Sequence, residues 1–246
     1  MNFCKTKAIT LKRRDYSNTS QIATFYTLDY GKVQTLAKGS KRIGKKVLGS
    51  IDLLCYSELI FIKREGSGLH VLTEWELLED FPAFRKNLEK FYAGCYVVEL
   101  VGELTEEEEK NEPLFLCILD ALCGLSGTKN PTVNLLALEL QMLKHLGYLP
   151  SLEECVCCDG RLLQGSDAFY SPVHRGLLCK SCSGEDGYKR LSPGALQAAK
   201  FLVSSKAAGL GRLRLSPYLC GELRGLSADY LSFALNKPMD MWKYLR

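Results

Sequence analysis

The sequence predicts an α+β protein with more than one domain, in which a small N-terminal β-barrel precedes an all-α domain. Two observations predict this division. Short runs of alternating or β-branched residues fill the first part of the chain, whereas apolar residues recur at helical spacing from residue 80 onward. A third observation places a module inside the helical part, because two Cys-x-x-Cys pairs, Cys155/Cys158 and Cys179/Cys182, interrupt it.

Five strands are expected in the first part, at residues 7–12, 21–28, 33–36, 52–63 and 69–75. Turn signals such as Asp29-Tyr30-Gly31-Lys32 and Glu65-Gly66-Ser67-Gly68 separate them. Five short strands linked by turns predict a closed barrel. The pattern leaves both an OB-fold and an SH3-like barrel open, and of these the OB-fold is typical of nucleic-acid binding.

The first helix is expected to begin through Asp80-Phe81-Pro82, because proline is favoured in the first helical turn. Its apolar stripe follows the spacing i, i+4, i+7, i+11 and i+14 and consists of Phe84, Leu88, Phe91, Cys95 and Val98. The acidic run at residues 106–109 predicts a solvated loop after this helix.

Four more helices are expected further along the chain. Two cover residues 114–125 and 132–146, with Gly147 as the C-cap of the second. The other two begin at Ser192-Pro193 and Ser216-Pro217, where a capping serine precedes proline, and Pro238 ends the last one. The predicted domains are a barrel at residues 1–79, a helical domain at residues 80–150 and 188–246, and a cysteine module at residues 151–187.

The cysteine module has the spacing of a four-thiolate metal site. Two Cys-x-x-Cys knuckles, separated by twenty residues, can turn four sulfurs toward one centre: Cys155, Cys158, Cys179 and Cys182. Zinc suits four soft ligands in a tetrahedron, and four cysteines leave no position for a reacting water. We therefore predict a structural Zn²⁺, with Cys157 facing away from it. Buried free thiols and two disulfides are the alternatives.

Positive charge is concentrated near the N-terminus. Residues 1–50 carry eleven Lys/Arg and two Asp/Glu, whereas the remaining residues carry 21 and 26. Such a concentration is typical of a surface that binds a polyanion, and a solvated lysine face is the alternative. The predicted DNA contacts form two clusters, Lys12, Arg13 and Arg14, and Lys38, Lys41, Arg42, Lys45 and Lys46. The candidates for stacking unpaired bases are Tyr16, Tyr26, Tyr30 and Tyr56.

The second basic cluster resembles a phosphate-binding P-loop through Gly39-x-x-x-x-Gly44-Lys45. Lys46, however, replaces the hydroxyl residue that would hold magnesium, and a strand is expected next instead of a helix. No nucleophile motif accompanies the three histidines of the chain. A non-enzymatic nucleic-acid-binding protein is therefore the favoured hypothesis, and a zinc-stabilised protein that acts on RNA or a nucleotide is the alternative.

The cysteine content indicates the compartment. Eleven cysteines, several of them inside apolar runs, are typical of a reducing environment. The first residues contain no apolar signal core, and no uncharged run approaches the roughly 20 residues of a membrane span. We therefore expect a soluble, cytoplasmic protein that does not use a membrane as a partner.

Several motifs resemble those of the RecO family of bacterial recombination mediator proteins. In chain order they are Tyr16, Thr27-x-x-x-Gly31-Lys32, Lys38-Gly39, Leu72-Thr73-x-x-Glu76-Leu77 and Leu146-Gly147-Tyr148-x-Pro150, followed by the Cys155/Cys158 knuckle. The resemblance covers nearly the whole chain. One departure is Asp159-Gly160, because the family usually has glycine directly after the knuckle.

The resemblance implies an OB-fold DNA-binding domain, a helical domain and a zinc module. It also implies binding of single- and double-stranded DNA, ATP-independent annealing of complementary strands, and a role in DNA repair at the nucleoid of a bacterial cytoplasm. The implied partners are RecR, the C-terminal tail of the single-strand-binding protein and, indirectly, RecA, which is loaded onto the coated strands.

Overall fold

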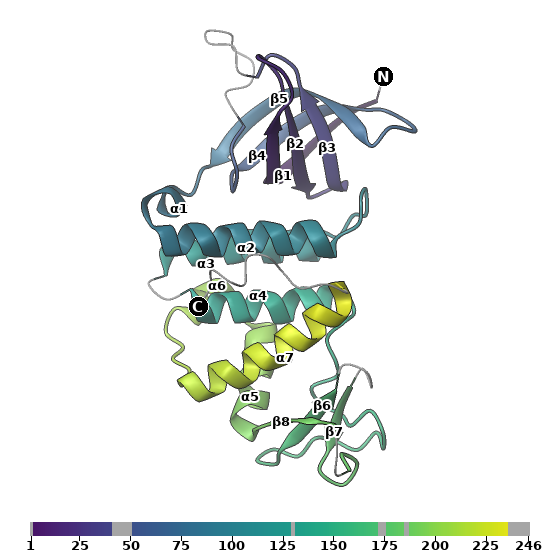
Figure 1. Cartoon of the computed structure of the whole chain (residues 1–246), viewed down its shortest axis with the longest axis vertical. Coiled ribbons are helices and arrows are strands. Elements are labelled where there is room, and N and C mark those ends of the chain that lie inside the picture. Colours follow the sequence, from purple (N-terminus) through teal and green to yellow (C-terminus); the bar gives the residue numbers. More distant parts are fainter. Residues whose placement is uncertain (1, 41–50, 129–130, 172–175, 185–186, 236–246) are drawn as a thin grey trace. The chain divides into compact units, whose positions relative to one another are not determined.

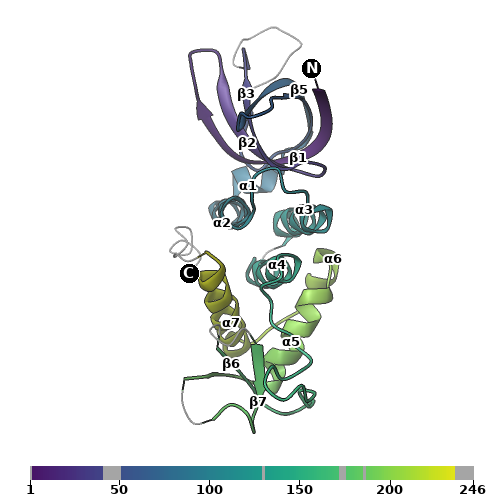
Figure 2. The same ribbon diagram turned by 90° about the vertical axis from the view of Figure 1, so that its right-hand side faces the viewer.

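The computed structural model describes residues 2–40, 51–128, 131–171, 176–184 and 187–235. It is a mixed α+β structure with an N-terminal five-stranded barrel and a C-terminal helical region that carries a small sheet (Figures 1 and 2). The chain forms two compact units, of which the first ends at Gly127 and the second begins at Thr128. Among the described residues, no helix combines the length and the apolar character needed to cross a bilayer.

The barrel consists of β1 (Asn2–Asp15), β2 (Gln21–Thr27), β3 (Gly31–Ala37), β4 (Tyr56–Lys63) and β5 (Leu69–Glu79). Its strand order is β1-β2-β3-β5-β4, and β4 closes the barrel against β1. All neighbours are antiparallel except β3 and β5. β1 is longer than the predicted residues 7–12, because its first half pairs with β4 and its second half with β2.

Inward-facing residues of the strands fill the barrel with a continuous apolar core: Cys4, Ala8, Ala23, Phe25, Val33, Ala37, Ile51, Leu59, Phe61 and Leu72. β4 begins later than predicted, because the chain turns at Leu54, a residue with the left-handed φ of 60°. A Cβ atom at Gly94 would lie 2.7 Å from Leu54 Cδ1, so the absent side chain of Gly94 makes room for Leu54.

Three helices follow the barrel within the first unit: α1 (Pro82–Lys86), α2 (Leu88–Leu104) and α3 (Glu112–Gly127). The single helix predicted from Pro82 to Val98 is wrong, because Asn87 is extended and interrupts it. The Asn87 side chain accepts a hydrogen bond from the Lys90 amide at 2.9 Å and so caps α2. The break rotates the buried face, which leaves Leu88 66% exposed while Tyr96 and Val97 are buried.

The turn between β2 and β3 joins the barrel to α2. Thr27 Oγ1 donates to the carbonyl of Gly31 at 2.9 Å and accepts from the Tyr30 amide at 3.0 Å. The Lys32 ammonium then donates to the carbonyls of Gly102, at 2.7 Å, and Thr105 at the end of α2. A cation from the barrel therefore satisfies carbonyl groups that the helix itself leaves unpaired.

The acidic segment, residues 106–109, is an exposed loop, as its charges predict, but it is attached to the barrel. Its backbone lies against β3, where the Glu108 amide donates to the Lys32 carbonyl at 2.9 Å. Gly31 has a φ of +63°, and a Cβ atom there would lie 2.1 Å from the Glu109 carbonyl oxygen. Only glycine allows this approach of the two backbones.

The second unit contains α4 (Thr132–His145), α5 (Pro193–Ser204), α6 (Ala207–Leu210) and α7 (Pro217–Leu235). It also contains a sheet of order β7-β6-β8, formed by β6 (Ala168–Ser171), β7 (Gly176–Cys179) and β8 (Lys189–Leu191). The predicted serine caps are confirmed, since Ser192 Oγ accepts from the Ala195 amide and Ser216 Oγ from the Leu219 amide, each at 3.3 Å. The predicted stop at Pro238 lies outside the described residues.

We expect Lys32→Met to lower the free energy of unfolding by about 1–3 kcal/mol, because the substitution removes charged hydrogen bonds to the end of α2. Urea denaturation measures the change. Lys38→Met is the matched control, because Lys38 is exposed and follows the same strand, and it should change stability by less than about 0.5 kcal/mol. Equal effects of the two substitutions would contradict the capping role.

Candidate nucleic-acid interface and metal centre

Two predicted DNA contacts, Lys12 and Arg14, lie exposed on β1 and point to the same side of the strand. Lys12 pairs with Thr24 and Arg14 with Ile22 across the β1–β2 ladder. Ala23, between these two partners, faces the barrel core. Both cations are therefore on the outer surface of the barrel, and neither has an ion-pair partner among the described residues.

A bulge in β1 produces this orientation. The register between β1 and β2 shifts between Thr10 and Lys12, which leaves Leu11 as the extra residue. Leu11 is buried, whereas Lys12, Arg13 and Arg14 are all exposed. The bulge thus ends the regular alternation of the strand and turns the following cations toward solvent.

Arg13 differs from its two neighbours because it is already paired. Its Nε lies 3.1 Å from Asp52 Oδ1, and Arg85 Nη2 lies 3.3 Å from Asp52 Oδ2. Burial alone raises the pKa of Asp52, but the Leu53 amide and the Arg13 guanidinium outweigh it and hold the pKa below its usual value. The carboxylate is therefore ionised near neutral pH and partly neutralises Arg13.

The second basic cluster begins at the same rim of the barrel. Gln21, at the start of β2, pairs with Asp15 of β1 and with Ala37 at the end of β3. Lys38 follows Ala37 directly and is exposed. Lys38 therefore lies at the rim where β1 ends, close along the strand ladder to Arg14.

Gln21 also fixes the chain on both sides of residues 41–50. It is completely buried, and its Oε1 accepts from Ser40 Oγ at 3.1 Å and from the Ile51 amide at 3.2 Å. Gln21 thereby connects Ser40 and Ile51 at the barrel rim. The remaining predicted contacts lie between these two residues in the sequence, outside the described residues: Lys41, Arg42, Lys45 and Lys46.

Charge is divided between the strands of the barrel. Residues 2–40, which include β1 to β3, carry seven Lys/Arg and two Asp/Glu, whereas residues 51–79, which include β4 and β5, carry two and six. The asymmetry seen along the sequence therefore becomes an asymmetry of the barrel surface. The strands β1 to β3 and their turns therefore carry the net positive charge of the barrel, and the segment of β4 and β5 carries a net negative charge.

The predicted stacking tyrosines have different environments. Tyr16, in the turn after β1, is 64% exposed. Tyr30 is half-buried and packs edge-on against Phe61, with ring centroids 5.4 Å apart. Tyr26 is completely buried and stacks on Phe115 of α3 at 6.3 Å, so its ring is not available to a base. Tyr56 is half-buried near the same Phe115. Tyr16 is thus the tyrosine best placed to reach an unpaired base.

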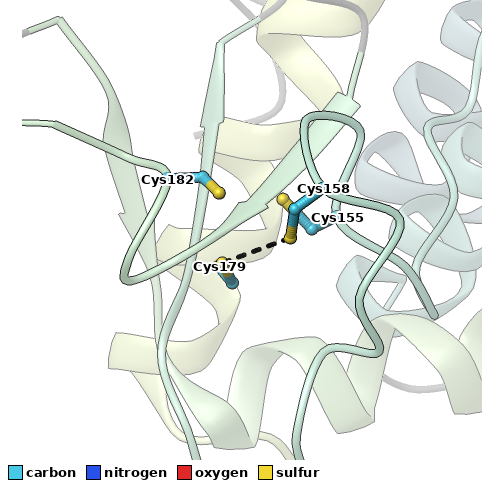
Figure 3. Close-up of side chains that lie close together, drawn as sticks. All are labelled: Cys155, Cys158, Cys179 and Cys182. Carbon is cyan, nitrogen blue, oxygen red and sulfur yellow. Dashed lines mark hydrogen bonds between the residues drawn. The ribbon is translucent and has the colours of Figure 1, made fainter.

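The four predicted metal ligands come together in the second unit. The sulfurs of Cys155, Cys158, Cys179 and Cys182 all lie within 4.8 Å of one another and point toward a common centre (Figure 3). Cys158 Sγ and Cys179 Sγ are 3.9 Å apart, close to the about 3.8 Å that tetrahedral Zn–S bonds of about 2.3 Å require. The cluster can bind a metal ion. Cys157 is exposed and not part of it.

Backbone amides of the cluster favour a thiolate at Cys155. Burial raises the pKa of Cys155, but the amides of Cys179, Cys157 and Cys158 outweigh this and lower it to about 6. Asp159, directly after the first knuckle, has the left-handed φ of 55°, a conformation that aspartate tolerates better than most residues. All eleven cysteines of the chain lie within the described residues, and none forms a disulfide. This arrangement contradicts the two-disulfide alternative.

Two features of the interface had no signal in the sequence. Gln21 acts through contacts to residues 19 and 30 positions away, and Asp52 through a contact to Arg13 that spans 39 positions. A glutamine at the start of a strand and an aspartate after a basic segment are unremarkable by themselves. Only the register of the closed barrel brings them to the rim.

Comparison with known proteins places this fold in a family. The family models described as "Recombination protein O N terminal" and "Recombination protein O C terminal" match residues 1–81 and 85–242. DNA repair protein RecO of Roseiflexus sp. (strain RS-1) is 32% identical over 234 residues, which cover 95% of this chain and 81% of the relative. DNA repair protein RecO of Pelotomaculum thermopropionicum is 30% identical over 246 residues, which cover 100% and 94%. The chain therefore belongs to the RecO family of DNA repair and recombination proteins.

Proposed function

We propose that this protein is a non-enzymatic recombination mediator of the bacterial cytoplasm. It binds single- and double-stranded DNA, anneals complementary strands and, with RecR, helps to load RecA onto strands covered by single-strand-binding protein, whose C-terminal tail it recognises. The observation that carries the proposal is the cationic rim of the barrel in a chain of the RecO family. The rim is formed by Lys12, Arg14 and Lys38, which have no ion-pair partner within the part of the chain that the structure describes.

We also propose that the barrel is an OB-fold. Its strand order and closure agree with a five-stranded Greek-key barrel, the architecture of that fold. OB-folds bind oligonucleotides on the face of their second and third strands and with the flanking loops. The cationic rim lies where β1, β2 and β3 meet, which agrees with this mode of binding.

The arrangement supports binding without sequence preference. Lysine and arginine contacts to phosphates fix a strand in place without reading its bases. Tyr16 adds a stacking surface that only unpaired bases can use. A strand held by its phosphates leaves its base edges free, and neutralised phosphates repel a second strand less. Both effects favour annealing of complementary strands and need no ATP.

For the cysteine cluster we propose a structural Zn²⁺. Four thiolates saturate the ion, so zinc supplies rigid attachment of the two knuckles and no reaction chemistry. The formal charge of such a centre is −2, and Arg161 and Lys180, which line an adjoining cavity of about 240 Å³, are placed to offset it. The strands around the cluster have only three or four residues each and gain stability from the attachment.

The double substitution Lys12→Glu with Arg14→Glu should weaken binding to single- and double-stranded DNA alike. The slope of log K against log salt should become shallower by about 0.7 per lost phosphate contact on a single strand and about 0.9 on a duplex. Fluorescence anisotropy over a salt series measures both quantities. Lys86→Glu with Lys144→Glu changes the net charge equally at other exposed positions, and an equal loss in this control would contradict a specific role of the rim.

The annealing activity has a direct test. Mixing the protein with complementary oligonucleotides covered by single-strand-binding protein should accelerate duplex formation equally with and without ATP, as followed by fluorescence quenching. The Lys12→Glu, Arg14→Glu protein should be slower. A requirement for ATP, or an equal rate for the double variant, would argue against the proposed mechanism.

Removing one thiolate of the cluster should release the metal. We expect one zinc per wild-type chain by elemental analysis, and less than half of this in Cys158→Ser or Cys179→Ser, together with reduced solubility and a lower melting temperature. Cys157→Ser is the control and should keep its zinc. A fully folded wild-type protein without metal, as shown by circular dichroism, would disprove the structural role.

A further inference from the structure

The barrel holds the carboxylate of Glu108 as it would hold a bound anion. Lys63 Nζ lies 2.6 Å from Glu108 Oε2, and His70 Nε2 lies 3.0 Å from Glu108 Oε1. The two donors come from β4 and β5 and contact different oxygens of one carboxylate. The Lys63 ammonium, through its hydrogen bond, lowers the pKa of Glu108, so the group is ionised near neutral pH.

The His70 donor is preorganised. Its side chain is 2% exposed and stacks on Phe61 with ring centroids 5.4 Å apart. Its Nδ1 accepts a hydrogen bond from the Arg64 amide at 3.3 Å, which leaves Nε2 as the protonated nitrogen that donates to Glu108. A buried ring with a fixed tautomer aimed at a partly exposed anion is a built recognition element.

The position of this element connects it with nucleic-acid binding. Lys63 and Arg64 begin the turn between β4 and β5, which in an OB-fold is one of the loops that bind oligonucleotides. Glu108 does not belong to a barrel strand but to the segment of chain that connects α2 to α3. This segment reaches its position with Glu108 at a φ of 59°, an unfavourable conformation for a glutamate.

We propose that Glu108 is an autoinhibitory stand-in for a DNA phosphate, which occupies the Lys63–His70 anion site until a single strand displaces it. The inference rests on the proposed DNA-binding function. A carboxylate and a phosphodiester oxygen accept from the same donors. Because the carboxylate belongs to the same chain, its effective concentration at the site is high, and a DNA phosphate has to compete with it.

The test compares two neutralising substitutions in the full-length protein. Glu108→Gln keeps the shape of the side chain and frees Lys63. Glu106→Gln removes the same charge from an exposed position in the same segment. With a labelled oligothymidylate as probe, Glu108→Gln should bind about 3–10-fold more tightly at low salt, with a salt slope steeper by about 0.7. Glu106→Gln should change the affinity less than about twofold.

Lys63→Met provides the second arm. In the wild-type background it should leave the affinity within about twofold, because Lys63 is already occupied, whereas in the Glu108→Gln background it should remove the gain. Equal affinities of Glu108→Gln and Glu106→Gln, or a gain that survives Lys63→Met, would overturn the inference. Thermal melting of each variant identifies any loss of folding.

The outcomes separate this inference from the proposed function. Wild-type binding without a gain in Glu108→Gln overturns the autoinhibitory role alone. Absence of binding in both the wild type and Glu108→Gln contradicts both proposals. Binding that appears only in Glu108→Gln supports both of them.

Discussion

Closure of the barrel by β1 is the constraint on which the candidate interface depends. The sheet closes because β1 pairs on both sides, with its first half on β4 and its second half on β2. The bulge at Leu11 lies at the change between the two pairings. The bulge turns Lys12 and Arg14 outward in the half of β1 that pairs with β2 alone. Barrel closure and the cationic rim are therefore both built on β1.

The contacts between the β2–β3 turn and α2 give a structural reason for one motif of the resemblance to the RecO family. The resemblance to that family includes Thr27, Gly31 and Lys32, and in a basic barrel Lys32 would be counted as a DNA contact. Its ammonium instead donates to carbonyls at the end of α2, and Gly31 makes room for the acidic segment. This motif therefore stabilises the first compact unit, and Lys32 is not among the cations proposed to contact DNA.

The sequence was sufficient for the features that depend on local chemistry. Strand alternation, capping serines and the two Cys-x-x-Cys pairs predicted most elements and the four clustered thiols. It was insufficient where two local signals competed or where distant residues meet. Asn87 breaks a helix that apolar spacing alone would continue, because its side chain can cap a new helix. The composition of the acidic run predicts only a solvated loop. In the structure it also contacts residues of three different strands: Lys63, His70 and Gly31. Nothing in the local sequence distinguishes Tyr26, which stacks on Phe115, from the exposed Tyr16.

The two units depend on different forces. The barrel has an apolar core that spans all five strands and a closed network of backbone hydrogen bonds. It therefore does not depend on a metal ion or a disulfide for stability. The small sheet of the second unit has strands of three or four residues, and its first knuckle is attached through single contacts such as the Val156 amide donating to the Leu177 carbonyl at 2.8 Å. Such short strands bury too little surface to hold two knuckles by packing alone. The proposed ion, bound by four thiolates, would supply the missing attachment, and this need accounts for the four clustered cysteines without any reaction.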